Sequence, residues 1–66
     1  MHITVNAKPM ELPENTTVRA LIEHLDLATA TCAAEVNKQL VPHQKHETHT
    51  LKDGDTIEIV TLVGGG

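Results

Sequence analysis

Three consecutive glycines, Gly64, Gly65 and Gly66, end the sequence, and their terminal carboxylate is the group best suited to chemistry. Glycine has no side chain to bury and the largest conformational entropy of any residue. The sequence therefore predicts a flexible tail at 64–66, outside a packed domain at 1–63. Extended at ~3.3–3.6 Å per residue, such a tail reaches roughly 10 Å, which suits a carboxylate that must enter a narrow channel.

A carboxylate resists nucleophiles because of its negative charge and poor leaving group, so it needs activation by another protein. Transfer of AMP from ATP to the Gly66 carboxylate would form an acyl-adenylate, and a sulfur nucleophile would then displace AMP to leave a thiocarboxylate. In this interpretation Gly66 bears the reacting carbonyl, while Gly65 and Gly64 thread it into the partner. The chain itself is expected to bind no cofactor, because ATP and magnesium belong to the adenylating partner.

The histidines and the single cysteine are the other candidates for chemistry. His43, His46 and His49 repeat every three residues, but no cysteine or carboxylate completes a tetrahedral zinc set. We interpret them as part of a solvated polar loop and expect no metal site. Cys32 lies among alanines, which favours a small buried hydrophobe over a reactive sulfur relay.

Composition argues against several classes of function. With 66 residues the chain forms one domain too small for a deep catalytic cleft, so we expect a protein substrate rather than an enzyme. A net charge of −4 and the lack of Phe, Tyr and Trp argue against a nucleic-acid partner. No apolar run approaches the ~18 residues of a membrane span, and nothing suggests secretion, so we expect a cytoplasmic location.

The elements that would position the tail begin with a hairpin and a helix. Apolar and polar residues alternate over the first dozen positions on either side of Asn6-Ala7-Lys8-Pro9, which predicts two strands joined by a turn. A helix is expected from Thr17 to Leu27. Its apolar positions recur with the spacing of one helical face, at Val18, Leu21, Ile22 and Leu25.

Three further strands are predicted in the second half of the chain. Two short strands, Cys32–Val36 and Gln39–Val41, flank a turn at Asn37-Lys38. A final strand, Thr56–Val63, follows the turn Asp53-Gly54-Asp55. This strand is apolar on both faces beyond Glu58, which is typical of a strand that is central or covered by a partner.

The final strand also provides the candidate docking surface. Val60, Leu62 and Val63 are apolar residues next to the tail, so we expect them to contact the enzymes that act on Gly66. Glu58 is the best candidate for a charged contact to a basic partner surface. The competing interpretation is that these apolar residues simply belong to the core.

The element order β-β-α-β-β-β predicts an α+β domain in which one main helix packs on a mixed sheet. Four motifs accompany this order: Thr17-Val18 before Leu21-Ile22, Val36-Asn37-Lys38-Gln39 before Val41-Pro42, Asp53-Gly54-Asp55, and the Gly65-Gly66 end. In these motifs and in the element order, the whole chain resembles the thiamine-biosynthesis sulfur carrier family, ThiS, a branch of the ubiquitin-like β-grasp proteins.

The resemblance implies a set of partners and a role for each terminal glycine. Gly66 would be adenylated by an E1-like, ThiF-like adenylyltransferase and converted to a thiocarboxylate. That group would supply sulfur to a ThiG-like thiazole synthase in thiamine biosynthesis, after loading from a sulfur donor such as a cysteine desulfurase. Gly65 matches the preceding family glycine, whereas relatives commonly vary at the position of Gly64.

Three alternatives remain at this stage. A small subunit of molybdopterin synthase resembles this fold and uses the same thiocarboxylate with another acceptor. A ubiquitin-like modifier would instead join Gly66 to a lysine amine. A plain interaction domain with an incidental tail would keep its function after deletion of Gly65 and Gly66.

Overall fold

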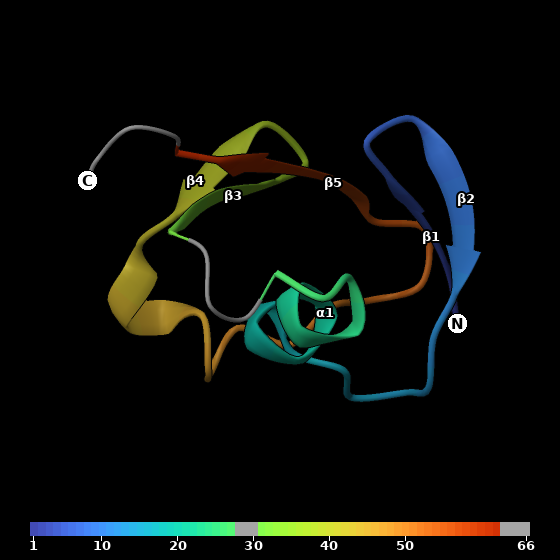
Figure 1. Cartoon of the computed structure of the whole chain (residues 1–66). Helices are drawn as coiled ribbons and strands as arrows, with labels where there is room; N and C mark the ends of the chain where they lie inside the picture. Colours follow the sequence, from blue (N-terminus) through green and yellow to red (C-terminus); the bar gives the residue numbers. More distant parts are fainter. Residues whose placement is uncertain (28–30, 63–66) are drawn as a thin grey trace.

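The described residues fold into a five-stranded sheet with one α-helix across one face (Figure 1). The computed structural model describes residues 1–27 and 31–62, so the predicted tail at 64–66 and the docking residue Val63 lie outside the described residues. The elements follow the predicted order. They are β1 His2–Val5, β2 Lys8–Glu11, α1 Val18–His24, β3 Cys32–Val36, β4 Gln39–Val41, the 3-10 turn η1 His43–Lys45, and β5 Thr56–Thr61.

Strand β5 is the middle strand of the sheet, whose order is β2-β1-β5-β3-β4. It runs parallel to β1 and antiparallel to β3, so the sheet is mixed, as predicted. Ile57 of β5 lies between Val5 of β1 and Val36 of β3 in the register, and all three side chains are buried. The central position explains why β5 has an apolar sequence.

Helix α1 begins where the sequence predicts and ends earlier. Thr17 is its N-cap, with a hydroxyl oxygen that accepts a hydrogen bond from the Ala20 amide at 3.1 Å. Leu21 is fully buried on the face that meets the sheet. The prediction of a helix to Leu27 is wrong by three residues, because Asp26 adopts a φ of 61° and the helix ends at His24.

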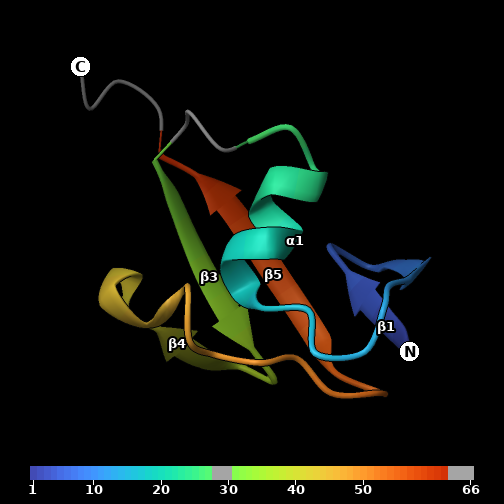
Figure 2. The ribbon, with the colours of Figure 1, turned by 90° about the horizontal axis from the view of Figure 1, so that it is seen from below.

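The core lies between α1 and the sheet. Figure 2, seen from the helix side, shows α1 crossing in front of β5. Val18, Leu21 and Ile57 are the largest fully buried side chains, and they come from these two elements. Leu25 and Leu27 pack against the same core although they lie beyond the helix. In the described residues, no helix is long and apolar enough to cross a membrane.

The segment around the three spaced histidines caps the helix, and it is solvated except at His46 and, in part, at His49. The backbone carbonyls of His49 and His46 accept hydrogen bonds from the amides of Val18 and Arg19 at 3.0 and 2.8 Å. Such amides in the first turn have no partner within the helix. The prediction of a solvated loop is therefore wrong for His46, whose side chain is only 4% exposed and whose Nε2 lies 3.1 Å from the Val41 carbonyl oxygen.

The predicted turn before β5 is confirmed, and both of its carboxylates bond backbone amides. Gly54 adopts a φ of 88°, a conformation that side chains rarely tolerate. Asp53 accepts a hydrogen bond from the His2 amide at 2.6 Å, and Asp55 accepts one from the Lys52 amide at 2.8 Å. This turn joins the start of β1 to the start of β5.

Candidate functional site

The described part of the candidate site is strand β5 and the residue that follows it. Gly66, Gly65 and Gly64 lie outside the described residues, as does Val63, so Leu62 is the last described residue before the tail. The Leu62 amide donates a hydrogen bond of 2.8 Å to the Thr31 carbonyl, which ties it to the start of β3. The sheet therefore holds the chain as far as Leu62, which is four residues before Gly66.

Two asparagines at the hairpin turns fasten β5 from both sides. The Asn6 side-chain oxygen accepts a hydrogen bond from the Ile59 amide at 2.8 Å, and the Asn37 side-chain oxygen accepts one from the Thr56 amide at 3.0 Å. The Asn37 amide group also donates to the Asp55 carboxylate at 3.0 Å. Side chains thus supply hydrogen bonds to β5 where the neighbouring strands turn away.

The same asparagines shape their own turns. Asn6 and Ala7 both have positive φ, at 50° and 69°, and so do Asn37 and Lys38, at 53° and 70°. Two consecutive residues with positive φ are typical of a type I′ hairpin, and asparagine tolerates this conformation well. Sequence reasoning predicted both turns but missed the bonds to β5, although the recurrence of Val-Asn at 5–6 and 36–37 was a signal.

The two faces of β5 differ in burial as the alternation predicts. Ile57 and Ile59 are buried against the helix, at 0% and 6% exposure. Val60 and Leu62 are 54% and 53% exposed, and Glu58 is exposed on the same strand. The described members of the predicted docking surface therefore lie outside the core, which rules out the competing core interpretation for them.

The exposed surface extends beyond β5 across two further strands. Glu35 of β3 lies opposite Glu58 on one side and opposite Leu40 of β4 on the other, while Ala33 lies opposite Val60. Leu40 is 66% exposed. Figure 1 shows α1 and the segment around η1 on one side of the sheet, with the other side uncovered. We call the following residues of this uncovered side the outer patch: Ala33, Glu35, Leu40, Glu58, Val60 and Leu62.

Sequence reasoning found half of the outer patch. Glu35 and Leu40 were missed because their membership depends on which residues lie opposite each other across strands. One local signal was available, since Leu40 alternates with the buried Val41 in the short strand β4. Exposed apolar groups that cluster on one face of a small protein are typical of an interaction surface.

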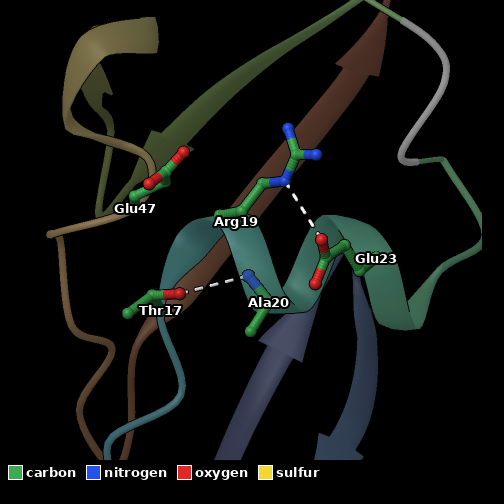
Figure 3. Close-up of a pocket in the computed structure, with 5 residues that line it drawn as sticks. All are labelled: Thr17, Arg19, Ala20, Glu23 and Glu47. Carbon is green, nitrogen blue, oxygen red and sulfur yellow. Dashed lines mark hydrogen bonds and ion pairs between the residues drawn. The ribbon is translucent and has the colours of Figure 1, made fainter.

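A hollow of about 410 Å³ lies on the opposite side of the molecule, beside α1 (Figure 3). Three of its four polar side chains have partners on the helix. The Arg19 Nε donates to the Glu23 carboxylate at 3.2 Å, and Thr17 caps the first turn. Such an exposed i, i+4 ion pair contributes about 0.3–0.5 kcal/mol to helix stability. The fourth, Glu47, is exposed and comes from the segment after η1.

The remaining chemically capable side chains also serve the fold. Within residues 1–27 and 31–62, no group of three His, Cys, Asp or Glu side chains is arranged to hold a metal ion. The rings of His43 and His46 are 5.2 Å apart and tilted by 59°. The prediction that Cys32 is buried is confirmed, and its sulfur lies 3.9 Å from the Leu27 carbonyl oxygen.

Comparison with known proteins gives a consistent result over the whole chain. The model of the ThiS family matches residues 3–66. The sulfur carrier protein ThiS of Escherichia coli (strain K12) is 35% identical over 66 residues, which cover 100% of both chains. The crystal structure of the thiamine biosynthesis protein ThiS from Geobacter metallireducens superposes with a TM-score of 0.83 at 33% identity, again over 100% of both chains.

A longer relative contains a segment similar to this chain. The thiazole synthase of Paramagnetospirillum magneticum (strain ATCC 700264 / AMB-1) is 32% identical over 66 residues. The match covers 100% of this chain and 20% of that synthase. In that protein, the similar segment therefore shares one polypeptide with the rest of the synthase.

We predict that Asn6→Ala destabilises the domain by about 1–2 kcal/mol, because the Ile59 amide loses its acceptor in a partly buried site. Asn6→Asp is the matched control, since it keeps an acceptor oxygen and tolerates the positive φ. Amide hydrogen exchange should accelerate at Ile59 in the alanine variant and stay near the wild-type rate in the aspartate variant. Equal exchange rates at Ile59 in both variants would contradict the proposed role of the side-chain bond.

Proposed function

The chain belongs to the ThiS family, and from this membership we propose that it is a sulfur carrier of thiamine biosynthesis that acts in the cytoplasm. The observation that carries the proposal is the family match, which runs through residue 66 and so includes all three terminal glycines. The β-grasp fold of the chain and its full-length similarity to a sulfur carrier support the same conclusion. In this role the chain is a protein substrate and not a catalyst.

The proposed reaction takes place at the carboxylate of Gly66. An oxygen of this carboxylate attacks the α-phosphorus of ATP, pyrophosphate leaves, and an acyl-adenylate forms. A donor such as a cysteine desulfurase carries its sulfur as a persulfide, which two thiols of a reductant convert to hydrosulfide while they are oxidised to a disulfide. The hydrosulfide then attacks the carbonyl carbon, and AMP leaves with the electron pair of the broken bond. The product is a thiocarboxylate, in which one terminal oxygen has been replaced by sulfur.

ATP and its magnesium ion are bound by the E1-like adenylyltransferase in this proposal. The chain contributes a tail without side chains, in which Gly65 and Gly64 let Gly66 reach a confined active site. It also contributes a rigid starting point for that tail, because β5 is the central strand and is bonded on both edges. Fixing the start of the tail reduces the number of conformations that must be lost when Gly66 reaches the active site.

Docking of the head on the adenylyltransferase is assigned to the residues nearest the tail. Val60 and Glu58 are exposed on β5, and the exposed Leu62 follows the end of this strand. Val63 was predicted to act with them and stays a proposal. Exposed apolar residues that cluster on one face are typical of an interaction surface, whereas a peripheral charge mainly steers encounter.

The proposed acceptor of the sulfur is a thiazole synthase. A segment similar to the whole of this chain forms 20% of the thiazole synthase of P. magneticum. Two domains that share one polypeptide in a relative commonly bind each other where they occur as separate proteins. The shared polypeptide supports a thiazole synthase as the partner that receives sulfur from Gly66.

We predict that Leu62→Asp weakens binding to the adenylyltransferase roughly tenfold or more, because it places a charge in an apolar contact. The isolated domain should stay folded, since Leu62 is 53% exposed. Calorimetric titration and thermal melting followed by circular dichroism measure the two effects. Gln44→Asp, on the exposed 3-10 turn, is a control of equal charge change. Unchanged affinity of the Leu62 variant, or its unfolding, would sink the docking assignment.

We also predict that one phenylalanine appended after Gly66 abolishes adenylation, because its side chain blocks entry of the carboxylate into a narrow channel. ATP–pyrophosphate exchange by the adenylyltransferase measures this step directly. One extra glycine appended at the same place is the matched control, and it should retain more exchange than the phenylalanine extension. Normal exchange with the bulky extension would refute the threading mechanism.

A further inference from the structure

Two carboxylates face each other across the centre of the outer patch. Glu35 of β3 and Glu58 of β5 are direct partners in the antiparallel register, and both are exposed. Residues opposite each other in such a pair have Cβ atoms about 4.5–5.5 Å apart, at which like charges are destabilising. Among the described residues, the ion pairs are His2–Glu11 and Arg19–Glu23, so no described cation balances the two central carboxylates.

Apolar side chains border this acidic pair. Leu40 lies directly beside Glu35 on the edge strand β4, and Val60 lies two positions beyond Glu58 on β5. Their exposures of 66% and 54% are the highest among the large hydrophobic residues in the described part of the chain. The outer patch is thus an apolar surface with a doubly negative centre.

We propose that the outer patch is a docking site for a basic protein surface that places an arginine between Glu35 and Glu58 and packs apolar side chains on Leu40 and Val60. The planar guanidinium has five donors in a fixed fork, and so it can bond two neighbouring carboxylates at once. The partner cation removes the repulsion between the carboxylates on binding. The acidic pair therefore lowers the stability of the free head and favours the complex.

The charge of the outer patch argues against a second copy of the chain and against nucleic acid as its occupant. A second copy of the chain, bound through the same patch, would bring four carboxylates together, because a two-fold interface repeats each patch. Nucleic acid would meet the same repulsion from its phosphates. Extension of the sheet at β4 is also disfavoured, since this edge strand has only three residues and is followed by Pro42.

The occupant assigned here is the thiazole synthase, and this assignment rests on the proposed function. The synthase is the partner that a comparison supports, through the similar segment within the P. magneticum protein. The patch includes Leu62, the last described residue before the tail. A synthase bound there would therefore receive the end of the chain close to its own surface.

The experiment compares binding of the wild-type chain and its variants to the purified thiazole synthase of the same organism by calorimetric titration. The variants are Glu35→Gln, Glu58→Gln and both together. Glu47→Gln is the matched control, because Glu47 is an exposed carboxylate beside the helix, on the covered side of the sheet (Figure 3). The double variant should bind roughly tenfold to a hundredfold more weakly, with a smaller dependence on salt, whereas the control should bind like the wild type.

Thermal melting of the free chain provides a second readout, because the double variant should bind the synthase more weakly but melt at a higher temperature. Removal of the facing charges should raise the melting temperature of the double variant by about 1–8 °C at low salt. A lower melting temperature would mean that the carboxylates stabilise the fold, and it would overturn the proposal.

Leu40→Gln should weaken synthase binding without unfolding the chain, because Leu40 is 66% exposed.

Three other outcomes overturn the inference. The first is that the double variant binds the synthase like the wild type. The second is that the double variant loses binding to the adenylyltransferase but not to the synthase. The third is that the wild-type chain does not bind the synthase. The intact mass of the wild-type chain distinguishes failure of the docking inference from failure of the proposed function. If the wild type acquires sulfur at Gly66 while the double variant binds the synthase normally, only the docking inference is wrong.

Discussion

The fold depends on the fixing of strand β5 between β1 and β3. Backbone pairing holds Ile57 between Val5 and Val36, and the side chains of Asn6 and Asn37 supply further bonds to the same strand. A central strand loses its freedom to slip by one residue, because a slip would move its buried side chains to the exposed face. The strand that leads toward the terminal glycines is therefore held on both of its edges.

The sheet built around this central strand has a covered side and an open side. The helix, the capping segment around His46 and the core lie on the covered side, where the His46 ring lies within hydrogen-bond distance of the Val41 carbonyl and Cys32 belongs to the core. The open side carries exposed Val60 and Leu40 around two facing carboxylates. A carrier that visits different enzymes needs this division, because the head must stay folded while its open face is alternately free and bound.

The sequence predicted what depends on local patterns and missed what depends on distant pairing. Alternation and turn residues predicted the element order, and Thr17 marked the start of the helix. The apolar last strand left open whether it is central or covered by a partner, and the strand pairing shows that it is central. The early end of the helix at His24 requires Asp26 to adopt a positive φ, which no apolar pattern reveals. Burial of His46 and the facing of Glu35 and Glu58 arise from contacts between separate elements, so spacing along the chain could not predict them.

The central claim is that the carboxylate of Gly66 becomes a thiocarboxylate that a thiazole synthase consumes. The most direct test is the intact mass of the chain purified from its native cells after deletion of the thiazole synthase gene. If Gly66 is converted in this way, a species in which one terminal oxygen is replaced by sulfur should accumulate. This species should be absent when the adenylyltransferase gene is also deleted. A chain found only with an unmodified carboxylate, or joined through Gly66 to the lysine of another protein, would contradict the claim.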